Sequence, residues 1–270
     1  MRQSLFRHLK GTSYMLKLDR ALKHLGELHA ATQAFVEREP CAVMFECDVK
    51  PREHVFRLRV FEQPPPAIGT IAADCIHNLR QALDHIAYRL AVFVGGDPPP
   101  NEDTAAFPIY SWRKKAKAVV LDDDRLAAKI GRPSGVPADL RAVLEDLQPY
   151  NRPDAKRLLV LEQMDNIAKH RFLPVTVTSA ATPNFHIGQL HASSITGPRA
   201  GRLEDGTDVL RFRPQPDADM NVGFQFTQDI SFTSDSPAEG EIITKLVNET
   251  RSYILYRVIR SLDPWLSRVL

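Results

Sequence analysis

Hydrophobic residues recur every three or four positions in four long stretches of the chain, which is the spacing of a helix with one buried face. These stretches cover about residues 12–39, 68–94, 154–170 and 236–263. Each is followed within a few positions by proline or glycine, which commonly end helices. The pattern therefore predicts four long helices, with two shorter ones at about 113–130 and 137–150.

Two other regions alternate between apolar and polar residues, as a strand with one buried face does. In the first, residues 41–61 hold two such runs separated by the sequence KPRE, which predicts a β-hairpin. In the second, residues 171–232 show the same period, interrupted by glycine- and proline-containing turns.

Helices with a single apolar stripe bury it most simply against one another. The expected fold is therefore mainly α: a bundle of four long helices with an inserted β-hairpin and a β-rich segment, α+β overall. The chain is expected to be a single domain over 1–270. Its main helical part would cover 12–170, and a C-terminal helix at 236–263 would complete the bundle.

Composition narrows the class of protein only a little. The 270 residues are 43% hydrophobic and 25% charged with a net charge of +2, which is ordinary for a globular protein and neither demands nor forbids nucleic acid. The three cysteines form no C-x-x-C pair, which favours a reducing, cytoplasmic setting. No apolar run has the length of a signal peptide core or a membrane span, so no membrane partner is expected.

The second long helix has an unusual polar face. At about 100° per residue its apolar side is continuous and comprises Ala72, Cys75, Ile76, Leu79, Ala82, Leu83, Ile86 and Leu90. The opposite arc comprises Asp74, His77, Asn78, Arg80, Gln81, Asp84, His85 and Tyr88. Helix propensity does not explain histidine or asparagine here, because neither is a strong helix former.

These residue types suit acid–base chemistry on a phosphate. Histidine can give and take a proton near neutral pH, and arginine is a fixed cation that binds phosphate. Arg80 and Asp84 are one turn apart and can pair along the helix. Arg80 and His85 form the spacing R-x-x-x-x-H, which places them roughly 140° apart around the helix.

The stretch HNLRQALDH resembles the signature of HEPN-domain ribonucleases. The resemblance implies an all-helical, usually dimeric protein that cuts RNA without a metal or cofactor, with two copies of the motif meeting at the dimer interface. It implies that Arg80 and His85 are the catalytic pair. Asn78 and Asp84 would support them, with His77 and Asp74 on the same face. A toxin or defence role with an inhibitory partner protein would fit the family.

A second polar cluster ends the third long helix. It comprises Asp165, Asn166, Lys169, His170 and Arg171. The cations suit the negative end of a helix dipole, and Asp165 can pair with Lys169 one turn later. If this helix packs beside the second, the two clusters could share one cleft.

The leading hypothesis is a metal-independent endoribonuclease. His85 would act as general base on a ribose 2′-hydroxyl or as general acid to the leaving oxygen, and Arg80 would hold the phosphate. The product would be a cyclic phosphate. Arg57 and Arg59 on the hairpin, and Lys114, Lys115 and Lys117, could guide the RNA backbone; each is also explained as an ordinary surface charge.

Two alternatives remain open. The polar clusters could be packing networks that fix helix register in a structural protein, or in one that binds nucleotides or RNA without cutting them. His77, His85, His170 and Asp165 could instead bind a metal between helices. Phosphate-binding, dinucleotide-binding and serine-hydrolase motifs are absent.

Overall fold

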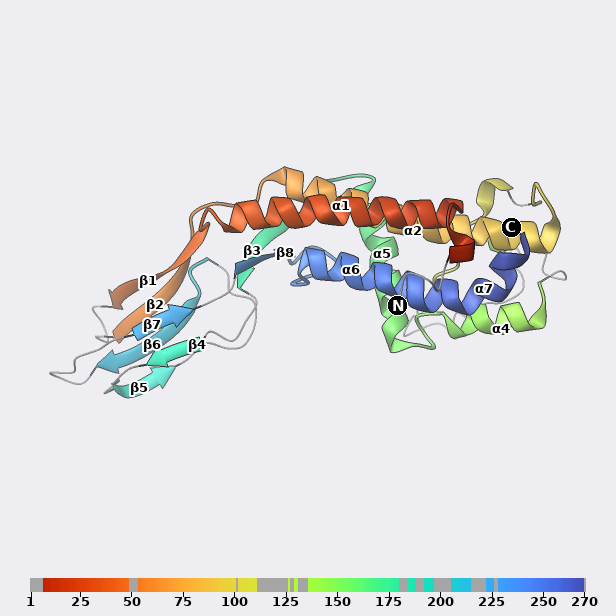
Figure 1. The fold of residues 1–270 in the computed structure, drawn as a ribbon. Coiled ribbons are helices and arrows are strands. Elements are labelled where there is room, and N and C mark those ends of the chain that lie inside the picture. The colour runs from red at the N-terminus through yellow and green to blue at the C-terminus, as the bar shows by residue number, and fades with distance from the viewer. Residues whose placement is uncertain are drawn as a thin grey trace. The chain divides into compact units, whose positions relative to one another are not determined.

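The computed structural model (Figure 1) describes residues 7–48, 53–100, 102–110, 126, 129–130, 136–179, 184–187, 192–196, 205–214, 222–225 and 228–269. The chain divides into two compact units. The helical unit consists of Met1–Glu27, Thr70–Leu173 and Thr244–Leu270. The sheet unit consists of Leu28–Gly69 and Pro174–Ile243. The organisation as a single domain stays a prediction.

Five helices lie in the described part of the chain. They are α1 (Ser13–Val36), α2 (Pro66–Gly95), α4 (Ala138–Asp146), α5 (Lys156–Ala168) and a continuous run of α6 (Ile243–Tyr253), the π-helix η6 (Ile254–Ile259) and α7 (Arg260–Leu266). Single 3₁₀ turns are η2 (Arg7–Leu9), η3 (Glu102–Thr104), η5 (Pro153–Ala155) and η7 (Ser267–Val269).

The prediction of a four-long-helix bundle is wrong, although the fold is α+β in the broad sense. The helix expected at 154–170 is α5, which has only 13 residues. The shorter helix expected at 137–150 is α4, which has nine. At 1.5 Å per residue, α5 extends roughly 20 Å and cannot run the length of the 24-residue α1. Figure 1 shows α5 running across the direction of α1 and α6. Most of the helix expected at 113–130 lies outside the described residues.

The C-terminal helix begins and ends later than its sequence pattern indicates. Residues before Ile243 form turns and isolated bridges from Ser231 to Ile242 and from Phe232 to Glu239, so they are not available to a helix. Pro264 lies inside α7 and does not end it. The preceding π-helix buries Ile254 and Ile259, and the helix continues through it. The Nε of Arg251 donates to the carbonyl oxygen of Leu18, 3.4 Å away, and so connects α6 to α1.

The expected hairpin is present as β1 (Cys41–Asp48) and β2 (Glu53–Val60), paired antiparallel from Cys41 opposite Val60 to Asp48 opposite Glu53. Its second strand also pairs with β6 (Asp208–Pro214), which pairs in turn with β5 (Ala192–Thr196). The hairpin and the later β-rich segment therefore share one four-stranded sheet, in the order β1-β2-β6-β5.

Two small sheets complete the sheet unit. One pairs β3 (Val175–Ser179) with β8 (Gln228–Phe232), and the other pairs β4 (Asn184–Ile187) with β7 (Val222–Gln225). All of these pairs are antiparallel. All four strands lie within the β-rich segment expected at 171–232.

The predicted core face of α2 is confirmed. Every apolar residue predicted for the inner side of α2 is buried. On α1, Leu22 is 45% exposed, while the neighbouring Ala21 is buried. The buried stripe then advances by three and four residues in turn, which is the period of one helix face. Its members are Leu18, Ala21, Leu25, Leu28, Thr32 and Phe35.

The two cysteine side chains that the structure describes are free and buried, Cys75 on α2 and Cys41 at the start of β1. Burial raises the pKa of the Cys75 thiol to about 12 and that of the Cys41 thiol to about 11. Within the described residues, the helices are too short or too polar to cross a bilayer.

Candidate functional site

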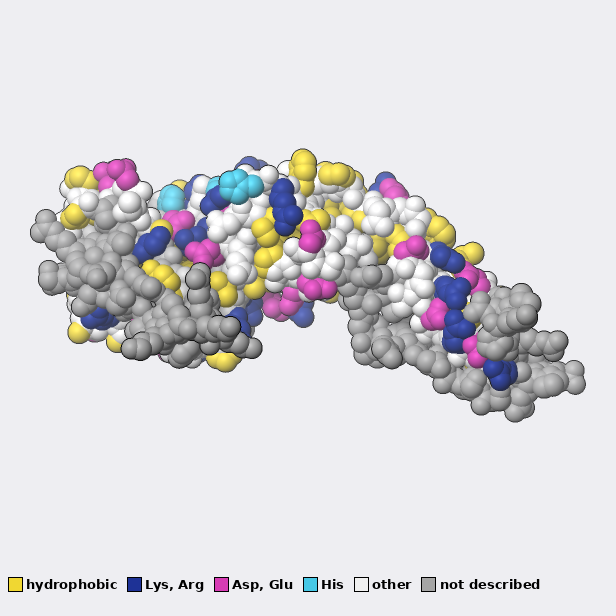
Figure 2. All heavy atoms as spheres, turned by 180° about the vertical axis from the view of Figure 1, so that it is seen from behind, with side chains coloured by type: hydrophobic (Ala, Val, Ile, Leu, Met, Phe, Trp, Pro, Cys, Tyr) yellow, Lys and Arg dark blue, Asp and Glu magenta, His cyan; other side chains and the backbone are white. Residues whose placement is uncertain are grey.

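The polar face of α2 does not form one open surface. Its residues divide among three surroundings: a buried ion pair around Arg80, a cavity at His85, and a hydrogen-bonded chain at His77. Figure 2 shows one face of the molecule, on which histidine side chains lie beside Lys and Arg side chains. The chemistry that each group can perform follows from its neighbours.

Arg80 is buried and already engaged. Its side chain is 10% exposed, and its Nη2 lies 3.0 Å from Oδ1 of Asp84 and 3.9 Å from Oε1 of Glu162 on α5. The same nitrogen donates to the carbonyl oxygen of Phe107 at 3.5 Å, and the backbone N–H of Phe107 donates to Asp84 at 3.1 Å. Arg80 therefore connects α2, α5 and the segment around Phe107.

This cluster contains two carboxylates, Asp84 and Glu162, around the single guanidinium of Arg80. Burial raises the pKa of Asp84, and Arg80 opposes that rise. Burial likewise raises the pKa of Glu162, against the attraction of Arg80 and Lys129. The Nη1 atom of Arg80 is buried and has no hydrogen-bond partner among the described residues. The guanidinium is held in place by protein groups.

His85 has the open position on α2. It lines a cavity of about 410 Å³ together with Ser13 of α1, Asp84, Tyr88 and Ala105. Burial lowers the pKa of His85, and the nearby Lys17 lowers it further. The imidazole is therefore neutral at pH 7, which is the form that accepts a proton.

The expected catalytic pair is not brought together around one cavity. Arg80 is not among the described residues that line the His85 cavity. Asp84 is the link between them, because it lines the cavity and also accepts from Arg80. Arg80 can thus influence the cavity through the position and charge of the Asp84 carboxylate.

The other histidine of the motif forms a chain of hydrogen bonds across three helices. Lys17 of α1 donates to Oε1 of Gln81, which leaves the Gln81 amide nitrogen to donate to Nε2 of His77 at 2.7 Å. Nδ1 of His77 then donates to Oδ1 of Asp165 at 2.8 Å, and Lys169 binds the second oxygen of Asp165 at 2.7 Å. This order requires a neutral His77 with its proton on Nδ1.

The polar face of α2 and the polar cluster at the end of α5 therefore meet at His77 and Asp165, and not at His85. The buried Asp165 contacts His77 of α2, and no bond joins it to His85 in the described structure. Asn166, His170 and Arg171 are exposed. Asp74 is exposed as well, and the Asn78 amide donates to its backbone oxygen at 2.8 Å. The cleft that was expected to join His85 with Asp165 and His170 is replaced by the His77–Asp165 contact.

A metal centre has little basis in this geometry. Among the residues proposed as ligands, His77 and Asp165 are joined by a direct hydrogen bond. In the described ranges, no three His, Cys, Asp or Glu side chains gather closely enough to hold a metal ion.

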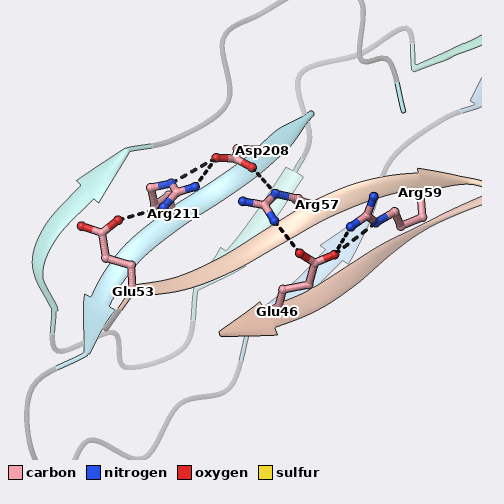
Figure 3. Close-up of polar contacts among 6 residues, drawn as sticks. All are labelled: Glu46, Glu53, Arg57, Arg59, Asp208 and Arg211. Carbon is pink, nitrogen blue, oxygen red and sulfur yellow. Dashed lines mark hydrogen bonds and ion pairs between the residues drawn. The ribbon is translucent and has the colours of Figure 1, made fainter. Parts of the chain in front are cut away.

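The arginines expected to guide RNA are neutralised in the sheet unit. Arg57 contacts Glu46 and lies 2.7 Å from Asp208, and Arg59 contacts the same Glu46. Arg211 lies 2.7 Å from Asp208 and 3.0 Å from Glu53. Figure 3 shows the six side chains as one connected series, here called the charge ladder, and Figure 2 shows alternating basic and acidic side chains. Lys114, Lys115 and Lys117 lie outside the described residues.

Comparison with known proteins adds no family. No family model matches the chain, and neither the curated proteins nor the solved structures contain a match to it.

Proposed function

We propose that the chain is a HEPN-like, metal-independent endoribonuclease in which His85 performs the proton transfer. The observation that carries the proposal is the position of His85: a histidine whose pKa is lowered by burial lines a cavity beside a carboxylate and two hydroxyl groups. A neutral imidazole with access to a cavity is what general-base catalysis needs.

In the proposed reaction, His85 takes the proton from a ribose 2′-hydroxyl. The 2′-oxygen then attacks the adjacent phosphorus, and the bond from phosphorus to the 5′-oxygen of the next nucleotide breaks. The products are a 2′,3′-cyclic phosphate and a 5′-hydroxyl, which takes up a proton. Arg80 is a positioning residue in this scheme, since it holds the Asp84 carboxylate at the cavity.

The family resemblance contributes the remaining parts of the proposal. It suggests a homodimer acting on single-stranded RNA in the cytoplasm, with a toxin or defence role and a protein that restrains it. Single strands suit such a site because their bases and 2′-hydroxyl groups are accessible.

A second candidate is favoured by the burial of Arg80. Its contacts with Asp84, Glu162 and Phe107 are those of a network that fixes how helices pack. In that case the chain is a structural protein, or one that binds nucleotides or RNA without cutting them. The two candidates differ in whether His85 is needed for an activity.

The test is incubation of purified protein with RNA in the presence of EDTA. We expect fragments ending in cyclic phosphate from the wild type and from His29→Ala, a matched control at an exposed histidine on α1. We expect none from His85→Ala, with an unchanged thermal midpoint. Cleavage by His85→Ala, or no cleavage by the wild type, would overturn the proposal; cleavage only without EDTA would indicate a metal enzyme.

A further inference from the structure

A second cavity of about 520 Å³ lies at the start of α1. It is lined by Lys10, Gly11, Thr12, Ser13, Arg89 and Val269. The described residues that line it include two basic side chains and no acidic one. Ser13 also lines the His85 cavity, so the two cavities meet at this residue.

Arg89 is better placed than Arg80 to act with His85. It follows His85 by four residues, so the two lie one turn apart on the same face of α2. Arg80 lies roughly 140° away around the helix. Arg89 donates to the backbone oxygen of Val269 through Nη2, while its Nε is buried and has no partner among the described residues.

Lys10 adds a second cation from a different segment. It is exposed, and no described residue forms an ion pair with it. The carboxylate of Asp263, which also lies at this end of the helical unit, is engaged by His8 at 2.8 Å and by the Ser267 hydroxyl at 2.7 Å. Among the described residues, neither Lys10 nor Arg89 forms an ion pair with a carboxylate.

The backbone contributes positive potential to the same cavity. Gly11 has a φ of +92°, which turns the chain into the helix. The Thr12 hydroxyl donates to the Leu9 carbonyl at 2.8 Å. The first turn of α1 has no acidic residue. The first N–H groups of a helix lack partners within it and attract anions.

We propose that this cavity binds a phosphate group of the RNA, with Lys10 and Arg89 as the cations next to His85. The proposal rests on the proposed function, and it assigns to Arg89 the phosphate contact that the sequence motif gives to Arg80. A phosphodiester held here would lie beside the His85 cavity, because Ser13 belongs to both.

The test uses a fluorescent single-stranded RNA with 2′-O-methyl riboses, which cannot be cut by attack of the 2′-oxygen. We expect Lys10→Gln and Arg89→Gln each to weaken binding about 10-fold at low salt and to reduce the salt dependence by about one phosphate contact. Lys23→Gln, an equal change of charge at an exposed position of α1, should alter binding less than about two-fold.

Two further measurements keep the outcome clear. Arg89→Gln also removes the contact to Val269, whereas Lys10 has no described ion pair, so an effect of Lys10→Gln with an unchanged thermal midpoint cannot come from unfolding. Inorganic phosphate should raise the thermal midpoint of the wild type and not that of Ser13→Asp, which places a carboxylate in the cavity.

The possible failures can be told apart. If Lys10→Gln and Arg89→Gln bind the RNA like Lys23→Gln, or phosphate leaves the wild type unchanged, the phosphate site is wrong whatever the cleavage assay gives. If both variants lose binding while no RNA is ever cut, the site stands as an anion-binding site and the ribonuclease proposal fails.

Discussion

Arg80 and His85 lie five residues apart on α2 but have opposite environments. The Arg80 side chain is 10% exposed and surrounded by Asp84, Glu162 and the Phe107 carbonyl, whereas His85 opens onto a cavity. A buried cation between two carboxylates matters for stability, because its removal leaves uncompensated buried charge. A histidine at a cavity contributes little packing.

Replacement of Arg80 is therefore expected to destabilise the helical unit far more than replacement of His85. Arg80→Ala should lower the free energy of unfolding by about 3 kcal/mol at neutral pH, and His85→Ala by less than about 1 kcal/mol. Because the loss comes from ionised Asp84 and Glu162, it should shrink as these groups become protonated in acid. Urea titrations of both variants at neutral and acid pH measure this; equal losses would contradict it.

The sequence revealed the members of the candidate site but not their grouping. The helical period correctly separated the buried and polar sides of α2, since that separation depends only on local spacing. Arg80 is buried because α5 and the segment at Phe107 pack over it. The sequence of α2 does not specify where those two segments lie. Arg89 lies outside R-x-x-x-x-H, so the motif does not select it, although it follows His85 by four residues in the sequence.

At the level of elements, α5 is held to α2 by a carboxylate that is almost completely buried. Asp165 is 1% exposed and accepts from His77 of α2 and from Lys169 of its own helix. Gln81 and Lys17 extend the same chain to α1. Three helices thus share one polar network, as expected for a contact that fixes how they pack.

Asp165→Ala should weaken the attachment of α5. We expect a loss of about 2 kcal/mol in the free energy of unfolding, because the change removes the buried carboxylate that accepts from His77 and Lys169. Amide exchange in α5 should increase. Asn166→Ala is the matched control, because Asn166 is exposed on the same helix, and it should cost under about 0.5 kcal/mol. Equal effects of the two changes would remove the role assigned to Asp165.

Element prediction succeeded where information is local and failed where partners are distant. The two helices expected near 12–39 and 68–94 are present as α1 and α2 within a few residues. The four-helix bundle failed because a 3–4 period gives no measure of the length of α5 or of its direction. The pairing of β2 with β6 could not be seen, since about 150 residues separate partners such as Arg57 and Asp208.

At the level of the whole molecule, the charge ladder of the sheet unit and the Arg80 cluster of the helical unit contain carboxylates whose pKa values shift in opposite directions. In the sheet unit, hydrogen bonds from Arg59 lower the pKa of Glu46. For Asp208, burial acts to raise the pKa, but Arg211 and Arg57 bring it below its ordinary value. In the helical unit, burial raises the pKa of Asp84 and of Glu162.

These shifts predict that acid opens the strands of the charge ladder before the helices around Arg80. A carboxylate whose pKa is lowered in the folded state stabilises the fold at pH values above its unfolded pKa, and that stability is lost as the pH falls through its folded pKa. A carboxylate whose pKa is raised in the folded state contributes stability in acid, and that stability is lost as the pH rises. Below about pH 4, amides of β2 and β6 should exchange before the fluorescence of the buried Trp265 changes. Glu46→Gln with Asp208→Asn should remove the early step. Loss of the helical unit first would contradict this.

The placement of the thiols makes each unit separately observable. Cys41 lies in the sheet unit and Cys75 in the helical unit, and the raised pKa of each leaves almost no reactive thiolate while the fold is closed. In a chain carrying Cys47→Ser, alkylation of Cys41 and Cys75 would proceed only through local opening. Mass spectrometry of the two labelled peptides would then time the opening of each unit independently, without an added probe.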